Sequence, residues 1–357
     1  MVSEVDNQYM RRCLQLAANG KQTCSPNPMV GAVIVHKGRI IGEGWHRKAG
    51  EPHAEPNAVR SVIECELLCE STMYVSLEPC SHFGKTPPCV ELIIRWGIPR
   101  VVIGTLDPFP LVSGRGVARL KESGIEVVVG VEEERCRKLN QSYFGYLNEG
   151  RPRVILKWAQ TADGYIDTAR SVGDNLSSLK ISTSFTQLVT HKLRSECDAI
   201  LVGTNTALLD DPSLNVRYWS GKNPLRLVID RMGVLPATAK LLDGSIETIV
   251  FSGVKSGREG KTSWILLDFN KNVLFQMMKE LSRLKIQSLL VEGGAFLHET
   301  FIQSELWDEI QVETSAQLIG SGVCAPNIDN ISTMSGGLQI YDAGSTYREI
   351  RNYEHAR

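Results

Sequence analysis

The sequence carries almost no net charge. Its 357 residues include 39 Lys and Arg against 40 Asp and Glu, a formal balance of −1 at pH 7. Proteins that bind nucleic acid through its phosphates normally show a basic surplus, which this chain lacks. We therefore expect no nucleic-acid partner.

Long hydrophobic runs are also missing. No apolar stretch reaches the ~20 residues that cross a bilayer, and the start, M-V-S-E-V-D-N, has no charged-then-apolar signal. We expect a cytoplasmic protein with no membrane-spanning segment. The length of 357 residues is enough for two domains, each with its own hydrophobic core.

Most of the nine cysteines have no metal-binding residue near them in the sequence. Seven are scattered through helix- and strand-like segments, and we interpret them as small buried hydrophobic side chains in a reducing cytosol. They are Cys13, Cys24, Cys65, Cys69, Cys136, Cys197 and Cys324. The helical spacing of Cys65 and Cys69 leaves a second metal site as a minor alternative.

The other two cysteines belong to the stretch with the strongest chemical signal. Residues 53–56 read H-A-E-P, and residues 78–89 read E-P-C-S-H-F-G-K-T-P-P-C. His53, Cys80 and Cys89 offer one nitrogen and two sulfurs. Three protein ligands are typical of a catalytic zinc, because the fourth tetrahedral position stays open for water. The sequence predicts one zinc ion per chain, held by these three residues.

Glu55, two residues beyond the histidine, is the candidate catalytic group because it can move protons to and from the water. A His-x-Glu followed by Pro-Cys and a second Cys is typical of zinc-dependent deaminases of nucleobase-like rings. We expect Cys89 at a helix N-terminus, where the dipole favours a thiolate. The alternative, a structural zinc site, would normally have a fourth Cys or His close by and would not need Glu55.

The spacing of the two cysteines narrows the choice of deaminase. Many single-ring deaminases hold them as C-x-x-C, whereas here eight residues intervene. The string S-H-F-G-K-T-P-P-C closely resembles the deaminase half of the bifunctional riboflavin-biosynthesis deaminase–reductases. So do P-N-P-M-V-G-A-V-I-V at 26–35 and G-E-G-W-H-R-K-A-G at 42–50.

Strand-like and helix-like segments alternate in the first half, which is typical of a layered α/β domain. We expect helices at 6–19, 53–70, 89–96 and 113–123 and strands at 30–35, 39–45, 73–77, 100–105 and 125–130. The resemblance implies a cytidine-deaminase-like three-layer fold. A turn-rich N-E-G-R-P follows, and we expect a deaminase domain at 1–148 and a reductase domain at 152–357.

The resemblance also implies the residues that hold the deaminase substrate, a phosphorylated pyrimidine. They are Asn27, His46, Lys85 and Asp107. Lys85 fits on physical grounds as well, being a basic residue in the zinc loop for an anionic substrate. At 107–110 the family pattern D-P-N-P is replaced by D-P-F-P, so Phe109 removes one amide contact with the ribose or phosphate.

The second half resembles the family's reductase, which has a dihydrofolate-reductase-like fold and uses NADPH. The matching segments are R-V-I-L-K-W-A at 153–159, L-R-S-E-C-D-A-I-L-V-G-T-N-T at 193–206, D-D-P-S-L-N-V-R at 210–217 and V-E-G-G at 291–294. Two glycines before a helix-like run are suited to cradling a diphosphate, because bare backbone N–H groups can approach it closely.

Two sets of reductase residues follow from this resemblance. For the substrate they are Ser178, Arg194, Leu214, Arg217 and Glu292, and for the cofactor Ala159, Lys180, Thr206, Asp210, Gly293 and Gly294. The two arginines are suited to clamping the ribose phosphate, because guanidinium groups bind phosphate in a bidentate manner. Where the family pattern reads S-x-W-I-T, this chain has S-L-K-I-S at 178–182, so Lys180 replaces a cofactor-packing tryptophan. Extra residues around 165–177 precede it.

The predicted function is a bifunctional enzyme of riboflavin biosynthesis, and we expect a homo-oligomer. The first domain would hydrolytically deaminate a diamino-ribosylamino-pyrimidinone phosphate, with zinc activating the water and Glu55 moving protons. The second would reduce the ribosyl group to ribityl with NADPH. One alternative makes the second half a non-catalytic oligomerisation domain. Another is a nucleic-acid editing deaminase, which the charge balance and cysteine spacing disfavour.

Overall fold

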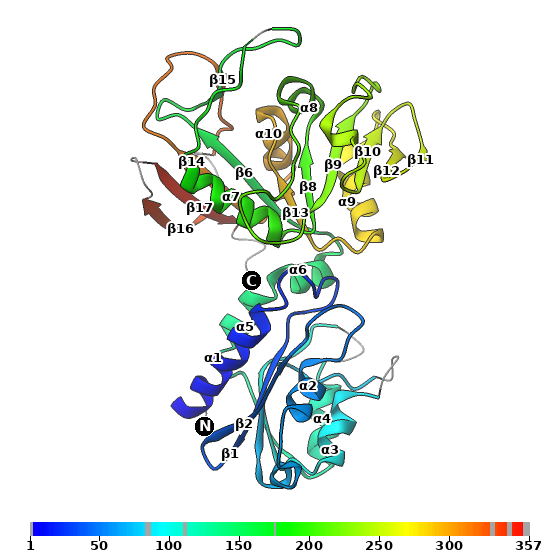
Figure 1. Cartoon of the computed structure of the whole chain (residues 1–357), viewed down its shortest axis with the longest axis vertical. Helices are drawn as coiled ribbons and strands as arrows, with labels where there is room; N and C mark the ends of the chain where they lie inside the picture. The colour runs from blue at the N-terminus through cyan, green and yellow to red at the C-terminus, as the bar shows by residue number, and fades with distance from the viewer. Residues whose placement is uncertain are drawn as a thin grey trace. The chain divides into compact units, whose positions relative to one another are not determined.

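The computed structural model of the chain describes residues 3–82, 87–109, 113–174, 176–328, 333–340 and 345–352. It consists of two compact units, Met1–Glu149 and Gly150–Arg357, which are described separately (Figure 1). None of the helices formed by the described residues has the length and hydrophobicity needed to cross a bilayer.

The first unit is built on a five-stranded sheet in the order β2-β1-β3-β4-β5. The strands are β1 (Gly31–His36), β2 (Arg39–Trp45), β3 (Thr72–Leu77), β4 (Arg100–Thr105) and β5 (Glu126–Val129). Strand β1 runs antiparallel to both β2 and β3, whereas β3, β4 and β5 are mutually parallel. The five predicted strands are thereby confirmed to within one residue at most ends.

Helices cover both faces of this sheet and make a three-layer α/β domain (Figure 1). They are α1 (Glu4–Ala18), α2 (Ala54–Arg60), α3 (Cys89–Arg95), α4 (Arg115–Glu122), α5 (Glu133–Leu139) and α6 (Gln141–Glu149). Met10 and Cys13 of α1 pack with Val33 and Tyr74 on one face. Ala58 of α2 belongs to the apolar cluster on the other face. The predicted fold class is confirmed in this half.

The predicted helix at 53–70 is wrong in its length. Helix α2 ends at Arg60, and a separate 3₁₀ helix, Cys65–Glu70, follows. The Ser61 hydroxyl accepts a hydrogen bond from the Glu43 N–H at 2.8 Å and donates one to the Ala58 carbonyl at 2.7 Å. These bonds tie the helix end to strand β2. The tie joins residues 18 apart in the chain, so the local sequence pattern does not reveal it.

The second unit contains a ten-stranded sheet in the order β11-β12-β10-β9-β8-β13-β6-β14-β17-β16. Its strands are β6 (Arg153–Gln160), β8 (Ala199–Val202), β9 (Leu225–Asp230), β10 (Thr248–Ser252), β11 (Gly257–Glu259), β12 (Thr262–Leu266), β13 (Ser288–Val291), β14 (Glu309–Thr314), β16 (Thr333–Ile340) and β17 (Thr346–Asn352). The seven strands from β12 to β14 are parallel, and antiparallel strands close both edges. A small ribbon pairs β7 (Tyr165–Asp167) with β15 (Val323–Cys324).

Helices again pack on both faces. They are α7 (Ser184–Glu196), α8 (Thr204–Asp210), α9 (Val273–Arg283) and α10 (Ala295–Gln303), with a 3₁₀ turn at Lys240–Leu242. Leu156 and Trp158 of β6 pack with Phe301 of α10 in the larger core cluster. The alternate residue Ile155 joins a second cluster on the opposite face. This alternation explains why residues 154–156, V-I-L, are continuously apolar, since a strand buried on both faces has no polar side.

The scattered cysteines are only partly as predicted. Cys13, Cys24, Cys136 and Cys197 are buried, but Cys65 is half-buried, and Cys69 and Cys324 are exposed. Cys69 lies in the 3₁₀ helix, which packs on the first unit mainly through Leu68. Cys324 lies in the exposed two-residue strand β15.

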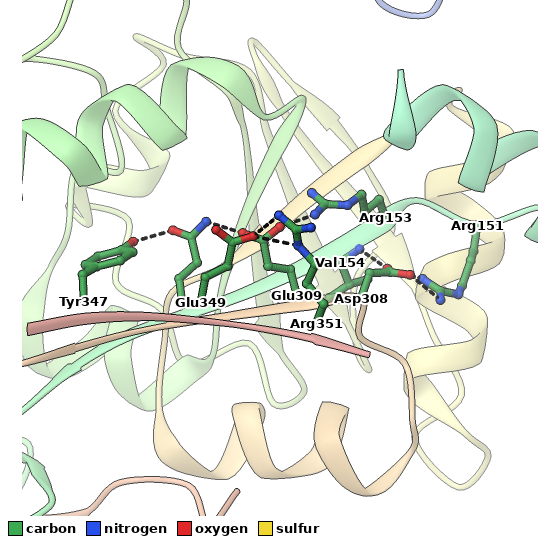
Figure 2. A network of polar contacts seen from close by, with 9 residues as sticks. Arg151, Arg153, Val154, Asp308, Glu309, Tyr347, Glu349 and Arg351 are labelled. Atoms are coloured by element: carbon green, nitrogen blue, oxygen red, sulfur yellow. Dashed lines mark hydrogen bonds and ion pairs between the residues drawn. The ribbon is translucent and has the colours of Figure 1, made fainter. Parts of the chain in front are cut away.

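A row of polar side chains joins β6, β14 and β17 in the second unit (Figure 2). Asp308 accepts two hydrogen bonds from the Arg151 guanidinium, at 2.8 and 3.0 Å, and one from the Val154 N–H at 2.6 Å. Arg153 pairs with Glu309 in the same row. Because these pairs join residues more than 150 positions apart, they hold the first strand of the unit in register with the last part of the chain.

Replacing Asp308 with Ala should destabilise the second unit by about 3 kcal/mol, because it removes the carboxylate that accepts hydrogen bonds from the largely buried Arg151 guanidinium and from the Val154 N–H. Urea unfolding followed by hydrogen exchange in β6 and β14 measures the effect. The control is Glu259→Ala, which removes an exposed pair with Lys255 and should cost under about 1 kcal/mol. Equal stability of the two variants would contradict this role for Asp308.

Candidate functional sites

Two helix starts and one loop bring the three predicted zinc donors together. His53 is the residue that precedes α2, Cys89 is the first residue of α3, and Cys80 lies in the loop after β3. The His53 Nδ1 lies 3.7 Å from the Cys80 Sγ and 3.4 Å from the Cys89 Sγ. All three donor atoms lie within 4.8 Å of one another, and the described residues contain no other such group.

The environment of the two sulfurs favours metal binding. The Cys89 N–H, at the start of α3, donates a hydrogen bond to the Cys80 Sγ at 3.3 Å. A hydrogen bond from the Cys89 thiol and the adjacent His53 lower the pKa of the Cys80 thiol well below its usual range. A thiolate is the form of cysteine that binds metal. A nitrogen, a thiolate and a second sulfur at this spacing fit a three-ligand zinc site.

Glu55 lies within the first turn of α2, beside this donor group. Its side chain is buried, and burial raises the pKa of the carboxyl, against the opposing effect of His53. The Cys89 thiol is within hydrogen-bonding reach of it. A buried carboxyl next to an open zinc position is what proton transfer at a bound water requires.

Asn27 and His46 also lie at the donor group. The His46 ring packs edge-on against the His53 ring, with centroids 5.5 Å apart. Its Nδ1 lies 3.1 Å from the Pro52 carbonyl, which can only accept, so the proton is on Nδ1. The Nε2 therefore accepts a hydrogen bond from the Asn27 amide at 3.1 Å. This bond orients Asn27 beside the metal ligands.

Asp107 follows β4 and is buried, which raises the pKa of its carboxyl. It accepts hydrogen bonds from the Phe109 N–H at 2.9 Å and the Tyr143 hydroxyl at 3.3 Å. Sequence reasoning missed Tyr143, which stands in the segment L-N-Q-S-Y-F at 139–144. It also missed Glu78, whose carboxylate accepts from the Asp107 N–H and orders this loop. Lys85 lies outside the described residues.

In the second unit, the cofactor candidates Gly293 and Gly294 lie against Thr206. A Cβ on Gly293 would sit 2.9 Å from the Val202 Cγ1 and 3.1 Å from the Thr206 Cγ2, so no side chain fits there. Gly294 has a φ of +78°, which disfavours other residues, and it precedes α10. Bare backbone at the start of α10 fits the diphosphate of a nicotinamide cofactor. Ala159 lies near the end of the neighbouring strand β6.

The remaining cofactor candidates lie outside this turn. Asp210, at the end of α8, forms an ion pair with Arg170 at 2.5 Å. Sequence reasoning missed Arg170, which comes from the extra segment before Ser178. Lys180 is exposed, and its carbonyl accepts a hydrogen bond from the Gln317 amide at 3.0 Å.

The candidate substrate-binding residues of the reductase differ in whether their side chains are already bound to other residues of the protein. Arg194 is bound to Glu292 through two hydrogen bonds of 2.8 and 2.6 Å, and both side chains are largely buried. Arg217 is bonded to the Asn215 side chain at 3.1 Å and has its guanidinium 4.7 Å from the Tyr218 ring centre. Ser178 is exposed, whereas the Leu214 side chain is buried in the core.

A buried charged pair that sequence reasoning missed lies nearby. The Lys157 ammonium is 3.7 Å from the Glu313 carboxylate, which also accepts a hydrogen bond from the Ser182 hydroxyl at 2.6 Å. The available signal was a lysine in the middle of the apolar strand V-I-L-K-W-A.

Comparison with known proteins identifies the family in which these two sites occur together. A family model for the RibD C-terminal domain matches residues 152–338, and one for the cytidine and deoxycytidylate deaminase zinc-binding region matches residues 3–105. The riboflavin biosynthesis protein RibD of Aquifex aeolicus is 43% identical over 332 residues, which cover 90% of each chain. The chain belongs to the RibD family. RibD of Escherichia coli is 36% identical over 369 residues, 97% of this chain and 96% of that one.

Solved RibD structures match nearly the full length of the chain. A diaminohydroxyphosphoribosylaminopyrimidine deaminase/5-amino-6-(5-phosphoribosylamino)uracil reductase from Thermotoga maritima superimposes with a TM-score of 0.89 at 35% identity, covering 98% of this chain and 99% of that one. RibD of Acinetobacter baumannii superimposes with a TM-score of 0.86 at 33% identity, with the same coverage. As a RibD protein, this chain is a bifunctional deaminase and reductase of riboflavin biosynthesis. Its deaminase domain binds zinc and its reductase domain uses NADPH.

The donor geometry predicts the metal content of single variants. Cys80→Ser and Cys89→Ser should each lose most of the bound zinc, because a hydroxyl is a poor replacement for a thiolate ligand. Metal analysis of the purified proteins measures this, with Cys69→Ser, an exposed cysteine, as the control that keeps full zinc. One zinc per chain in both ligand variants would refute the assignment.

Proposed function

We propose that residues 1–148 form the deaminase and residues 152–357 the reductase, and that the two act in turn on one phosphorylated pyrimidine. This proposal is carried by one observation in each unit. In the first unit, the buried Glu55 lies beside the donor group His53, Cys80 and Cys89. In the second unit, the Gly293–Gly294 turn leaves bare backbone for a cofactor. The name of the Thermotoga maritima relative gives a deaminase activity and a reductase activity, which supports deamination followed by reduction.

In the deaminase, His53, Cys80 and Cys89 would hold the zinc, which supplies the Lewis acidity that makes water a nucleophile near neutral pH. Glu55 would take one proton from the water as it adds to the amino-bearing ring carbon and pass it to the adjacent ring nitrogen. It would then pass the second proton of that water to the leaving amino group, so that ammonia departs and a ring carbonyl remains. The Asn27 amide, oriented by His46, is placed to bond the polar edge of the ring. Lys85 and Asp107 would contact the ribose and phosphate.

In the reductase, NADPH supplies the hydride that converts the ribosyl group to ribityl. The N–H groups at the start of α10 bind the cofactor diphosphate, with Thr206 beside them. Ala159, Lys180 and Asp210 complete the proposed cofactor set. Arg217 binds the substrate phosphate, and Ser178 and Leu214 lie on the two segments that flank α7 and α8. Arg194 and Glu292 neutralise each other, so the pair presents hydrogen-bonding groups without a net charge.

We further propose that the protein acts in the cytoplasm as a homo-oligomer. None of its nine cysteines, all of which lie among the described residues, forms a disulfide bond, which fits a reducing compartment. Light scattering coupled to size-exclusion chromatography measures the number of chains.

Glu55→Gln should keep its fold and zinc but lose deamination by a factor of about 10²–10⁴, since an amide cannot transfer the proton. Ammonia release from the diamino substrate measures this loss. The reductase in the same chain is the control, and it should still oxidise NADPH when given deaminated substrate. Deamination within a few-fold of the parent would assign Glu55 another role.

The two arginines should respond differently to substitution. Arg217→Ala should lower the reductase kcat/KM at least about tenfold through loss of a charge-assisted phosphate contact, and Lys should rescue it poorly. Arg194→Ala should instead destabilise the unit by about 3 kcal/mol, because Glu292 is left buried without a partner. Reductase kinetics and thermal unfolding separate these effects. Parental kinetics in Arg217→Ala would remove this residue from the site.

A further inference from the structure

The loop that carries Arg217 is held at three consecutive residues by two side chains of α7 and by Asn223 further along the same loop. The Asn215 carbonyl accepts a hydrogen bond from the Arg194 guanidinium at 3.1 Å, and the Val216 N–H donates to the Asn223 side chain at 2.7 Å. The Arg217 N–H donates to the His191 Nδ1 at 3.0 Å. A loop tied at each of three successive residues has little backbone freedom left.

Two of these ties come from one face of α7. His191 and Arg194 are three residues apart, so their side chains lie next to each other on the helix. The Arg194 guanidinium also donates two hydrogen bonds to the Glu292 carboxylate. Within the described part of the chain, the Arg217 guanidinium contacts the Asn215 side chain and the Tyr218 ring, and it forms no ion pair with a carboxylate.

The contact between His191 and the loop requires a neutral imidazole. A ring nitrogen accepts a hydrogen bond only when it carries no proton, so the proton of His191 is on Nε2. Burial, together with Arg194 and Arg217, lowers the pKa of His191 to about 4, and Glu292 opposes this shift. The ring also packs edge-on against Tyr218, with centroids 4.8 Å apart. His191 thus holds both the backbone of Arg217 and the ring beneath its guanidinium.

We propose that His191 is a positioning residue for phosphate recognition in the reductase. Its Nδ1 fixes the Arg217 N–H, and this fixes where the guanidinium stands when the substrate's ribose phosphate arrives. The inference rests on the proposed phosphate contact of Arg217. It adds a residue that never touches substrate yet sets the preference for the phosphorylated form.

The test compares phosphorylated and dephosphorylated deaminated substrate in full-length His191 variants. His191→Leu and His191→Gln should raise the KM for the phosphorylated form about three- to tenfold, the effect of one lost hydrogen bond, with kcat nearly unchanged. The KM for the dephosphorylated form should not change. His191→Asn should recover most of the loss, because its amide oxygen can occupy the position of Nδ1 and accept the same bond. Thr190→Val, which alters only a hydrogen bond within α7, is the control.

The outcomes separate the inference from the function it rests on. If Arg217→Ala loses the phosphate preference while His191→Leu and His191→Gln both keep it, the positioning role is overturned and the phosphate contact stands. If Arg217→Ala keeps the preference, the phosphate contact itself is overturned. A His191→Asn variant as impaired as His191→Gln would also overturn the inference, because the acceptor at Nδ1 would not be what matters.

Discussion

Both sites depend on one geometric constraint, the turn from the end of a parallel strand into a helix. In the first unit the loop after β3 carries Cys80 and leads to Cys89 at the start of α3. In the second, β13 runs through Glu292 and the two glycines into α10. Each turn offers N–H groups that have no carbonyl partner within the helix, together with the positive end of the helix dipole. The chain uses the first for a thiolate, and we propose that it uses the second for a diphosphate.

Burial of charge is the second condition that shapes the reductase. A buried ion pair gives little net stability, but removing one partner is costly. Arg194 with Glu292 and Lys157 with Glu313 are such pairs. Because Arg194 is paired with Glu292 inside the protein, we propose that phosphate recognition falls to Arg217, whose loop is held by Arg194, Asn223 and His191. This division was not foreseen from the sequence, where both arginines have the same standing.

The features that could be predicted from the sequence are those whose pattern lies within a short segment of the chain. The α/β architecture and the zinc donors were readable, because alternating strands and the pattern around His53 and Cys80 are contained in short segments. The end of α2 at Arg60 was not, since it depends on Ser61 meeting Glu43 on another strand. The pairing of Arg194 with Glu292 joins residues 98 apart. No local pattern reveals such a contact, and His191 was missed for the same reason.

We infer that one chain carries two chemistries that act in order. The most direct measurement incubates the pure protein with the diamino-ribosylamino-pyrimidinone phosphate, with and without NADPH, and follows ammonia release and NADPH oxidation together. We expect ammonia in both cases, and NADPH oxidation that lags behind ammonia release and approaches one equivalent. Ammonia release with no NADPH oxidation, or oxidation that precedes ammonia, would contradict it.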